Sequence, residues 1–186
     1  MNSRCRAIQS DGMTKEEKPK ENTKMRKSQK GFSLVELLIV VAIILIISAI
    51  AIPSLIRSRM AANEASAVAS LRAINTGEVT YNNTYPGTFA ALSSLGPDSA
   101  NCTNPVPANA CLIDNLLANA TSADTAKSGY MFNVTATPSS YTSEAEPASQ
   151  GSTGTRGFCS DQDMDLFYVT VGGGFSTCTT ANGTPL

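Results

Sequence analysis

A single carboxylate inside an apolar run is the first feature of this sequence that could do chemistry. Glu36 lies within residues 32–52, which otherwise depart from apolar character only at Ser33 and Ser48. An ionised carboxylate in hydrocarbon costs about 2.5 to 3.5 kcal/mol, so it needs a partner or a function. Gly31 precedes the run and places a small residue where charged sequence gives way to apolar sequence. This boundary is therefore the leading candidate for a functional site.

The rest of the chain offers little for catalysis. It contains no histidine, and it lacks a Gly-x-Ser-x-Gly sequence, a Walker loop and a dinucleotide-binding fingerprint. We therefore expect no enzymatic activity, no catalytic residue and no cofactor.

A second group of carboxylates follows in the C-terminal part of the chain. Asp161, Asp163 and Asp165 occupy alternate positions, as an oxygen-rich calcium loop would require. The sequence lacks the glycine at the sixth position and the glutamate at the twelfth position of an EF-hand loop. A solvated turn between two strands is thus the default interpretation, and calcium binding is the alternative.

Four of the five cysteines follow the apolar run, and Cys5 precedes it. An even number of cysteines beyond a membrane segment indicates disulfides formed outside the cytoplasm. Loop-closure entropy favours the sequence-local pairing of Cys102 with Cys111 and of Cys159 with Cys178. Each bridge would contribute about 3 kcal/mol to stability. Zinc is the alternative, but neither a Cys-x-x-Cys spacing nor a histidine supports it.

Charge is distributed unevenly along the chain. Residues 1–31 contain nine Lys or Arg and four acids, which leaves five basic and eleven acidic groups beyond them. A basic segment before an apolar run is typical of a cytoplasmic flank under the positive-inside rule. Five scattered cations are too few for a surface that follows a phosphate backbone, so one chain is not expected to bind nucleic acid directly.

Hydropathy predicts the element that carries Glu36. As a helix, residues 32–52 would be about 32 Å long, close to the roughly 30 Å of a hydrocarbon core, so the segment can span a membrane once. Pro53 interrupts the backbone hydrogen-bond ladder and predicts a kink. Residues 53–78 are expected to continue as an amphipathic helix whose apolar stripe packs on the following domain. The stripe consists of Ala61, Ala65, Val68, Leu71 and Ile74.

From residue 79 the composition favours a globular, β-rich domain. Gly, Pro, Ser, Thr and Asn alternate with short apolar runs, which is typical of strands and loops. Gly77 and the polar run at residues 82–84 mark the expected end of the helix. A short helix is predicted near residues 112–120, and the glycines at 172–174 predict a turn or bulge. The strands expected in an antiparallel sheet lie near residues 130–137, 141–146, 156–159 and 166–171.

The sequence around Gly31 resembles a known processing signal. Lys-Gly-Phe-Ser-Leu-Val-Glu-Leu-Leu, from Lys30 to Leu38, is similar to the class III signal of type IV prepilins and type II secretion pseudopilins. In that family a membrane aspartyl peptidase cuts after the glycine and methylates the new N-terminus. The resemblance therefore implies that residues 1–31 form a cleaved cytoplasmic leader, with cleavage between Gly31 and Phe32 and N-methylation of Phe32.

The same resemblance implies a role for Glu36 and a fold. In a helical filament, Glu36 of one subunit can pair with the new Phe32 α-amine of a neighbour, which fixes the stagger between subunits. The implied fold is an α+β lollipop. It has a long N-terminal transmembrane and amphipathic helix packed on a small antiparallel sheet, and a globular domain at residues 79–186 with disulfide-bounded loops.

The implied function is that of a structural subunit of a type IV pilus, serving motility, adhesion or DNA uptake. The chain would be a single-pass inner-membrane protein before assembly and part of a cell-surface filament afterwards. Implied partners are further copies of the chain, a prepilin peptidase, an assembly ATPase, an inner-membrane platform protein and a secretin. The alternative is a pseudopilin of the type II secretion system. A C-terminal loop bounded by Cys159 and Cys178 favours the pilin.

Three other interpretations of the N-terminal region stay open. Glu36 could lie at the headgroup level of an ordinary single-pass anchor. Ala49-Ile50-Ala51 resembles a signal peptidase site, although the apolar run is long for a signal peptide. Translation from Met25 would leave a short basic leader.

Overall fold

The computed structural model describes residues 31–97, 102, 104–170 and 181–186. The chain divides into two compact units, one ending at Val41 and the other beginning at Ala42. The helix α1 begins in the first unit and continues in the second. The described helices are α1 (Leu34–Thr84), α2 (Leu92–Leu95), α3 (Asn115–Ala118) and the 3-10 helix η1 (Ala123–Thr125). The described strands are β1 (Tyr130–Ala136), β2 (Tyr141–Pro147), β3 (Gly157–Asp161), β4 (Leu166–Val169) and β5 (Thr184–Pro185).

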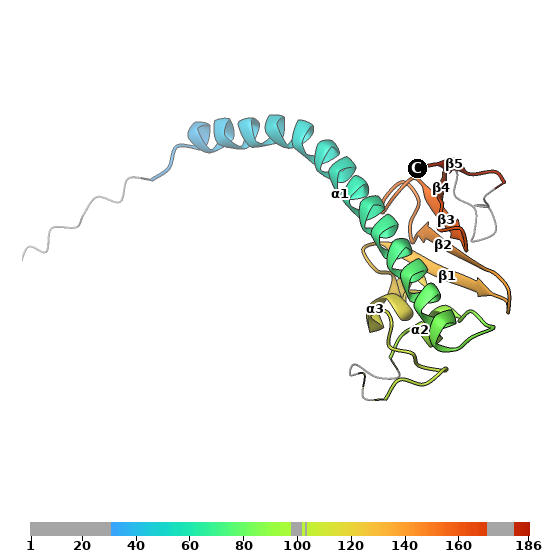
Figure 1. The fold of residues 1–186 in the computed structure, drawn as a ribbon. Coiled ribbons are helices and arrows are strands. Elements are labelled where there is room, and N and C mark those ends of the chain that lie inside the picture. The colour runs from blue at the N-terminus through green and yellow to red at the C-terminus, as the bar shows by residue number, and fades with distance from the viewer. Residues whose placement is uncertain (1–30, 98–101, 103, 171–180) are drawn as a thin grey trace, which may run out of the picture. The chain divides into compact units, whose positions relative to one another are not determined.

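The five strands form one sheet in the order β1-β2-β3-β4-β5, and every neighbouring pair is antiparallel. The sheet is therefore a meander in which each strand pairs with the next one along the chain (Figure 1). Antiparallel neighbours can follow one another along the chain in this way without a crossover connection. The predicted antiparallel sheet is confirmed, and the strand that was expected near residue 156 begins one residue later, at Gly157.

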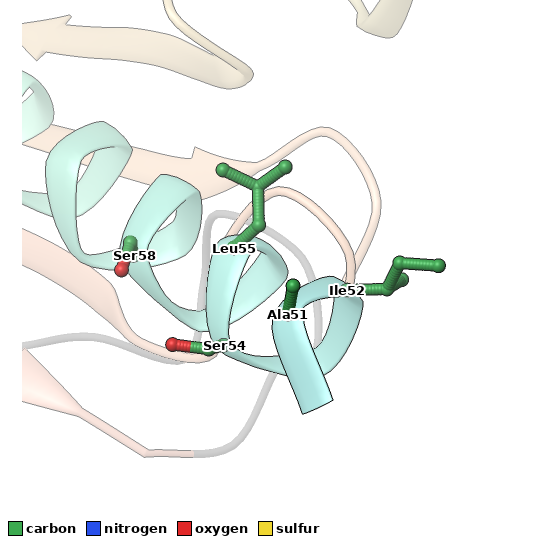
Figure 2. A pocket seen from close by; sticks show the side chains of 5 residues that line it. All are labelled: Ala51, Ile52, Ser54, Leu55 and Ser58. Atoms are coloured by element: carbon green, nitrogen blue, oxygen red, sulfur yellow. The ribbon is translucent and has the colours of Figure 1, made fainter. Parts of the chain in front are cut away.

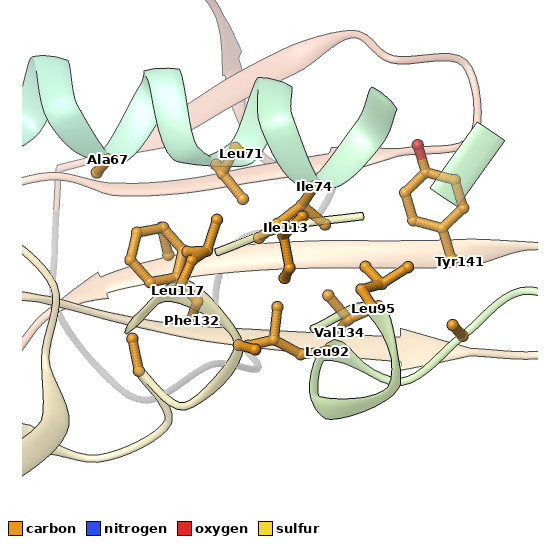
Figure 3. Packing of buried hydrophobic residues seen from close by; sticks show 14 of the residues in the cluster. Ala67, Leu71, Ile74, Leu92, Leu95, Ile113, Leu117, Phe132, Val134 and Tyr141 are labelled. Carbon is orange, nitrogen blue, oxygen red and sulfur yellow. The ribbon is translucent and has the colours of Figure 1, made fainter. Parts of the chain in front are cut away.

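The C-terminal part of α1 packs against the sheet and the short helices. Its buried residues recur three or four positions apart, so they lie on one face of the helix. They meet apolar side chains from α2, α3, β1 and β2 (Figure 3). The largest fully buried apolar side chains are Leu71, Ile74, Leu95, Leu117, Tyr130, Phe132, Tyr141 and Phe158. The fold is thus a long helix that packs, through its C-terminal part, on a small antiparallel sheet.

The predicted apolar stripe was correct only in part. Leu71 and Ile74 are buried and Val68 packs against the core, but Ala61 and Ala65 are exposed. The buried face also contains the polar residues Glu64, Ser70, Asn75 and Glu78. Hydropathy alone cannot find such positions, because their burial depends on polar partners elsewhere in the chain.

The ends of α1 and α3 agree with the sequence to different degrees. The helix α1 ends at Thr84, in the predicted polar run, and passes through Gly77. A Cβ on Gly77 would lie 3.3 Å from Cγ2 of Ile113, so this glycine allows close packing inside the helix. The short helix expected from residue 112 begins only at Asn115, because the backbone N–H groups of Leu112 and Ile113 donate to the carbonyl oxygen of Leu95.

Candidate functional site

The candidate cleavage boundary lies at the start of α1. Gly31, Phe32 and Ser33 precede the helix, and the N–H of Leu37 donates to the carbonyl oxygen of Ser33 at 3.2 Å. Glu36 is therefore in the first helical turn, where a negative charge interacts favourably with the helix dipole. Both Phe32 and Glu36 are exposed. Neither of the two ion pairs found among the described residues involves Glu36.

The apolar segment that follows is exposed along its whole length. From residue 32 to residue 56 its large apolar side chains keep between 45 % and 79 % of their surface accessible. The helix α1 is the one helix in the described part of the chain that is long and apolar enough to cross a membrane. Exposed apolar surface on this scale is typical of a site that contacts lipid or protein.

The helix assignment continues through Pro53 without a break. Five residues around this proline line a shallow, open apolar surface (Figure 2). All five belong to α1, so no other element encloses them. This surface therefore continues the exposed face of the helix and is not an enclosed ligand site. Its lining residues are Ala51, Ile52, Ser54, Leu55 and Ser58.

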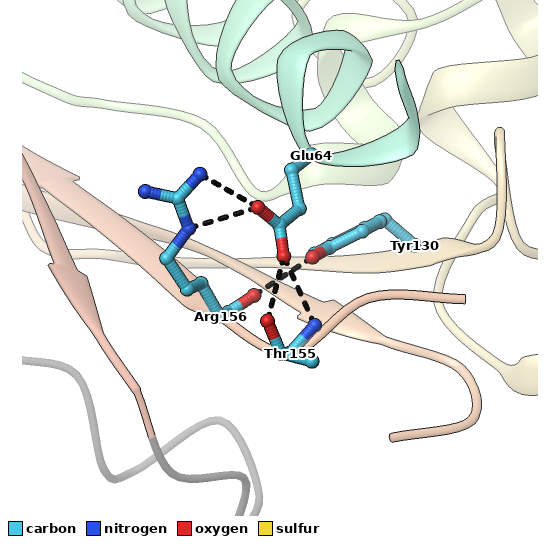
Figure 4. A network of polar contacts seen from close by, with 4 residues as sticks. All are labelled: Glu64, Tyr130, Thr155 and Arg156. Atoms are coloured by element: carbon cyan, nitrogen blue, oxygen red, sulfur yellow. Dashed lines mark hydrogen bonds and ion pairs between the residues drawn. The ribbon is translucent and has the colours of Figure 1, made fainter. Parts of the chain in front are cut away.

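Farther along α1, Glu64 attaches the helix to the sheet region (Figure 4). Its Oε2 accepts hydrogen bonds from Nε and a terminal nitrogen of Arg156 at 2.8 and 2.6 Å. Its Oε1 accepts from the N–H and the hydroxyl of Thr155, both at 3.0 Å. Burial alone would raise the pKa of Glu64, but the bonds from Thr155 and Arg156 outweigh burial and hold it below its ordinary value. Glu64 is therefore a fixed anion with a complete set of partners.

A buried polar network joins α1 to two strands. The amide nitrogen of Asn75 donates to the hydroxyl of Ser160 on β3 at 2.7 Å. The hydroxyl of Ser143 on β2 donates to the amide oxygen of Asn75 at 3.2 Å. All three side chains are at most 5 % exposed. Because buried polar groups are costly without partners, this network fixes the rotation of the helix over the sheet.

The first predicted disulfide is confirmed. Cys102 and Cys111 are bonded, with their Cα atoms 5.9 Å apart. Cys159 on β3 is also disulfide-bonded, whereas its predicted partner Cys178 lies outside the described residues, as does the turn predicted at residues 172–174. The bridge between Cys102 and Cys111 closes part of the loop between α2 and α3.

The aspartates proposed as a calcium alternative surround the turn between β3 and β4. The N–H of Asp163 donates to Oδ1 of Asp161 at 3.1 Å, and the N–H of Met164 donates to the carbonyl oxygen of Asp161 at 2.9 Å. Met164 has φ 65, a left-handed conformation that serves the turn. Within the described ranges, no group of three or more His, Cys, Asp or Glu residues is placed to hold a metal ion. The turn, which also contains Asp165, therefore uses Asp161 as a local hydrogen-bond acceptor.

Sequence reasoning missed Glu64, Asn75 and Glu78 as positions of structural importance. Each is a polar residue on the buried face of α1, and each binds a group that is distant in sequence. The available signal was their spacing, since 64, 67, 71, 75 and 78 follow helical periodicity. Polar residues at core-facing positions indicate specific partners, although they do not identify them.

Comparison with known proteins finds one family model that matches the N-terminal boundary. The family model described as the prokaryotic N-terminal methylation motif matches residues 26–52. This match covers Gly31, Phe32, Glu36 and the exposed apolar part of α1 up to Ile52. The N-terminal segment therefore resembles the class of proteins that carry this methylation motif.

A curated relative narrows this class. The chain is 44 % identical over 73 residues to the type IV wide pilus major component PilA4 of Thermus thermophilus. The alignment covers 38 % of this chain and 56 % of the relative, so the chain spans little more than half the length of the protein it matches. No solved structure matches the chain. The chain is thus similar to a type IV pilus component over part of its length, and it carries the N-terminal methylation motif.

Proposed function

We propose that this protein is a structural subunit of a type IV pilus, polymerised through the N-terminal part of α1. The observation that carries the proposal is the exposure of the apolar side chains at residues 32–56 on a helix whose later part is buried in a folded domain. Burying apolar surface contributes about 25 cal/mol per Å2, so an exposed surface of this length favours insertion into a bilayer or assembly with other copies. The proposed subunit has no enzymatic role and is itself a substrate of processing enzymes.

Processing would complete the assembly site. Removal of the leader at residues 1–31 creates an α-amine on Phe32, whose ordinary pKa is about 8. N-methylation of this amine retains its positive charge. Glu36 lies one helical turn from it and has no cation partner in the described part of the chain. In the filament, Glu36 of one subunit pairs with the Phe32 amine of a neighbour, and each charge offsets the desolvation penalty of the other.

The proposed organisation follows the chain. Residues 32–52 form the membrane-spanning and filament-core part of the helix, residues 53–78 form its amphipathic part, and residues 79–186 form the periplasmic or extracellular domain. Pro53 is the proposed site of a local kink. The subunit is held in the inner membrane until a prepilin peptidase, an assembly ATPase, a platform protein and a secretin act on it. The pilus would serve motility, adhesion or DNA uptake.

N-terminal sequencing and intact mass measurement test this proposal. Protein is recovered separately from sheared surface material and from the membrane fraction. A chain beginning with methylated Phe32 and abundant in the sheared fraction is the expected result. The same terminus confined to membranes would favour a type II secretion pseudopilin, and a terminus at Ile52 or an uncut leader in every fraction would overturn both assignments.

A further inference from the structure

The carboxyl group of Glu78 is fully buried near the C-terminal end of α1. The side chain is 0 % exposed. Its Oε2 accepts a hydrogen bond from the backbone N–H of Ala90 at 3.0 Å. Its Oε1 is also buried, and no hydrogen-bond partner for it exists among the described residues. Glu78 thus has one partner where Glu64, on the same helix, has a full set.

A second unpartnered polar group acts on the same carboxyl. Tyr141 on β2 is 1 % exposed, and its buried hydroxyl has no hydrogen-bond partner in the described part of the chain. Its ring extends from β2 toward α1 (Figure 3). Burial, together with the charges of Glu78 and Asp161, raises the pKa of Tyr141 above its ordinary value. Tyr141 therefore stays neutral and supplies no positive charge to Glu78.

Among the described residues, no cation is found to interact with Glu78. On its own helix Glu78 interacts with Tyr81, which in turn interacts with Tyr85. From the sheet, Tyr141 on β2 interacts with Glu78, and Tyr141 also interacts with Asp161 at the end of β3. The loop at residues 85–91 contributes the backbone N–H of Ala90. Burial raises the pKa of Glu78 to about 7, and the Ala90 hydrogen bond only partly opposes this.

Besides this bond, the loop at residues 85–91 is attached through Tyr85, whose N–H donates to the carbonyl oxygen of Tyr81 at 2.7 Å, and through contacts with Asn82 and Phe89. The side-chain amide of Asn82 donates to the carbonyl oxygen of Thr88 at 3.0 Å. The ring of Phe89 packs against the ring of Tyr141, with centroids 5.0 Å apart. Glu78, Phe89, Ala90 and Tyr141 therefore form the junction of α1, this loop and β2.

We propose that Glu78 is a proton-linked contact that holds the loop at residues 85–91 against α1 when neutral and loosens it when ionised. A neutral carboxyl keeps its carbonyl oxygen as an acceptor for Ala90 and leaves no buried charge. An ionised carboxylate without a cation is costly in a dry site, and its energy falls if water reaches it. Because the side chain is 0 % exposed, water reaches Glu78 only when a covering segment moves, and the loop that donates the Ala90 N–H is bonded to it directly.

The direction of the pH effect follows from linkage. The folded-state pKa of Glu78 is about 7, above the ordinary value of 4.5. The contribution of Glu78 to stability is therefore fully present below about pH 4.5, declines as the pH rises, and is lost above about pH 7. For a difference of this size the folding equilibrium shifts by up to about 300-fold across the window. Opening of the loop alone would hydrate the ionised carboxylate and so remove the same energetic cost without global unfolding.

Urea unfolding of the full chain in detergent micelles tests the proposal. Unfolding is followed by tyrosine circular dichroism from pH 4.5 to 8.5 in the wild type and in Glu78→Gln, which keeps an acceptor for Ala90 but cannot ionise. We expect the wild type to lose stability relative to Glu78→Gln as the pH rises, by up to about 300-fold in the equilibrium constant. Parallel profiles for the two proteins would overturn the proposal. Glu64→Gln is the matched control and should retain the loss above pH 5.

Hydrogen exchange of the wild type gives a second test that does not depend on the variant folding. Exchange rates are corrected for the intrinsic effect of pH, and a peptide containing Ala90 is compared with one containing Phe132, whose N–H donates to Ala120 on the other side of the core. We expect protection of Ala90 to fall more than tenfold between pH 5 and pH 8 relative to Phe132. Equal changes in both peptides would contradict the proposal.

Discussion

The early part of α1, up to residue 56, and its later part, from residue 64 onward, differ in what covers them. Leu37 in the early part is 60 % exposed, whereas Leu71 in the later part is 0 % exposed, although both are leucines in the same helix. The later part finds its partners within the chain, on the sheet and on the segments around α2 and α3. The early part has none within the described residues, and exposed apolar surface on this scale is typical of a site that contacts lipid or protein. One helix thus carries both the surface that holds the domain and the surface that we assign to assembly.

The three glutamates of α1 extend this comparison. Glu36 is exposed within apolar sequence, Glu64 is buried and paired with Arg156, and Glu78 is buried without a cation. Glu64 completes its interactions inside the folded chain. We expect Glu36 to take a partner from outside the chain, whereas burial raises the pKa of Glu78 to about 7 and favours its neutral form below that pH. A carboxylate on this helix therefore has to be interpreted from its surroundings and not from its residue type.

Replacing Glu36 by leucine should have the largest effect on the early part of the helix. Loss of one partner of a buried ion pair costs about 3 to 5 kcal/mol, so surface filaments should fall by at least about 100-fold. Immunoblots of sheared and membrane fractions measure this loss. The membrane-bound chain should still begin at Phe32, which separates an assembly defect from a processing defect. Filaments at wild-type abundance would rule out the proposed pairing.

Alanine substitutions at Leu71 and Leu37 compare the two surfaces directly. Leu71→Ala removes a fully buried side chain and should lower the free energy of unfolding by about 2 to 5 kcal/mol. Leu37→Ala should change the stability of the solubilised domain by less than about 0.5 kcal/mol. Urea unfolding in detergent measures both values. A large loss for Leu37→Ala would show that the early part of the helix has a partner within the chain.

An effect smaller than the loss of Leu71 is expected for the paired glutamate. Glu64→Gln should cost about 1.5 to 3 kcal/mol at pH 7, because hydrogen bonds to a charged group are lost. The pKa of Glu64 is lowered in the folded protein, so its contribution is present above the ordinary value of 4.5 and is lost as the pH falls further. The difference between variant and wild type should thus shrink at low pH, opposite to the trend expected for Glu78. Urea unfolding curves at pH 7 and pH 3.5 measure the stability difference between Glu64→Gln and the wild type. A difference that does not change with pH would refute the role of Glu64 as a paired anion.

The sequence predicted those parts of the fold that depend on local pattern. The apolar run at residues 32–52 and the polar run at 82–84 located α1 well, and alternating strands with turn residues located β1 to β4. The start of α3 was missed because backbone bonds to Leu95 keep the preceding residues extended. Such hydrogen bonds join residues that are distant in sequence, and local sequence patterns do not reveal them.

The polar residues of α1 likewise divide into those that local sequence indicates and those whose partners are distant in sequence. Gly31, Phe32 and Glu36 were predicted as site residues because their signal is local, a charge boundary followed by one carboxylate in apolar sequence, and their roles stay predictions. The partners of Glu64 lie 91 and 92 residues away along the chain, and the N–H that binds Glu78 lies 12 residues away in a loop. Nothing in the spacing of these glutamates distinguishes the paired one from the unpaired one. Only the packing of the helix on the domain does so.

Electron cryomicroscopy of sheared filaments would show directly where α1 lies. We expect the early part of α1 to form the filament centre, with the carboxylate of Glu36 in one subunit within ion-pair distance of the Phe32 amine of a neighbour. The later part should remain packed on its own sheet through Leu71 and Ile74. A filament with residues 32–52 on its outer surface, or with Glu36 facing solvent and unpaired, would rule out assembly through this helix.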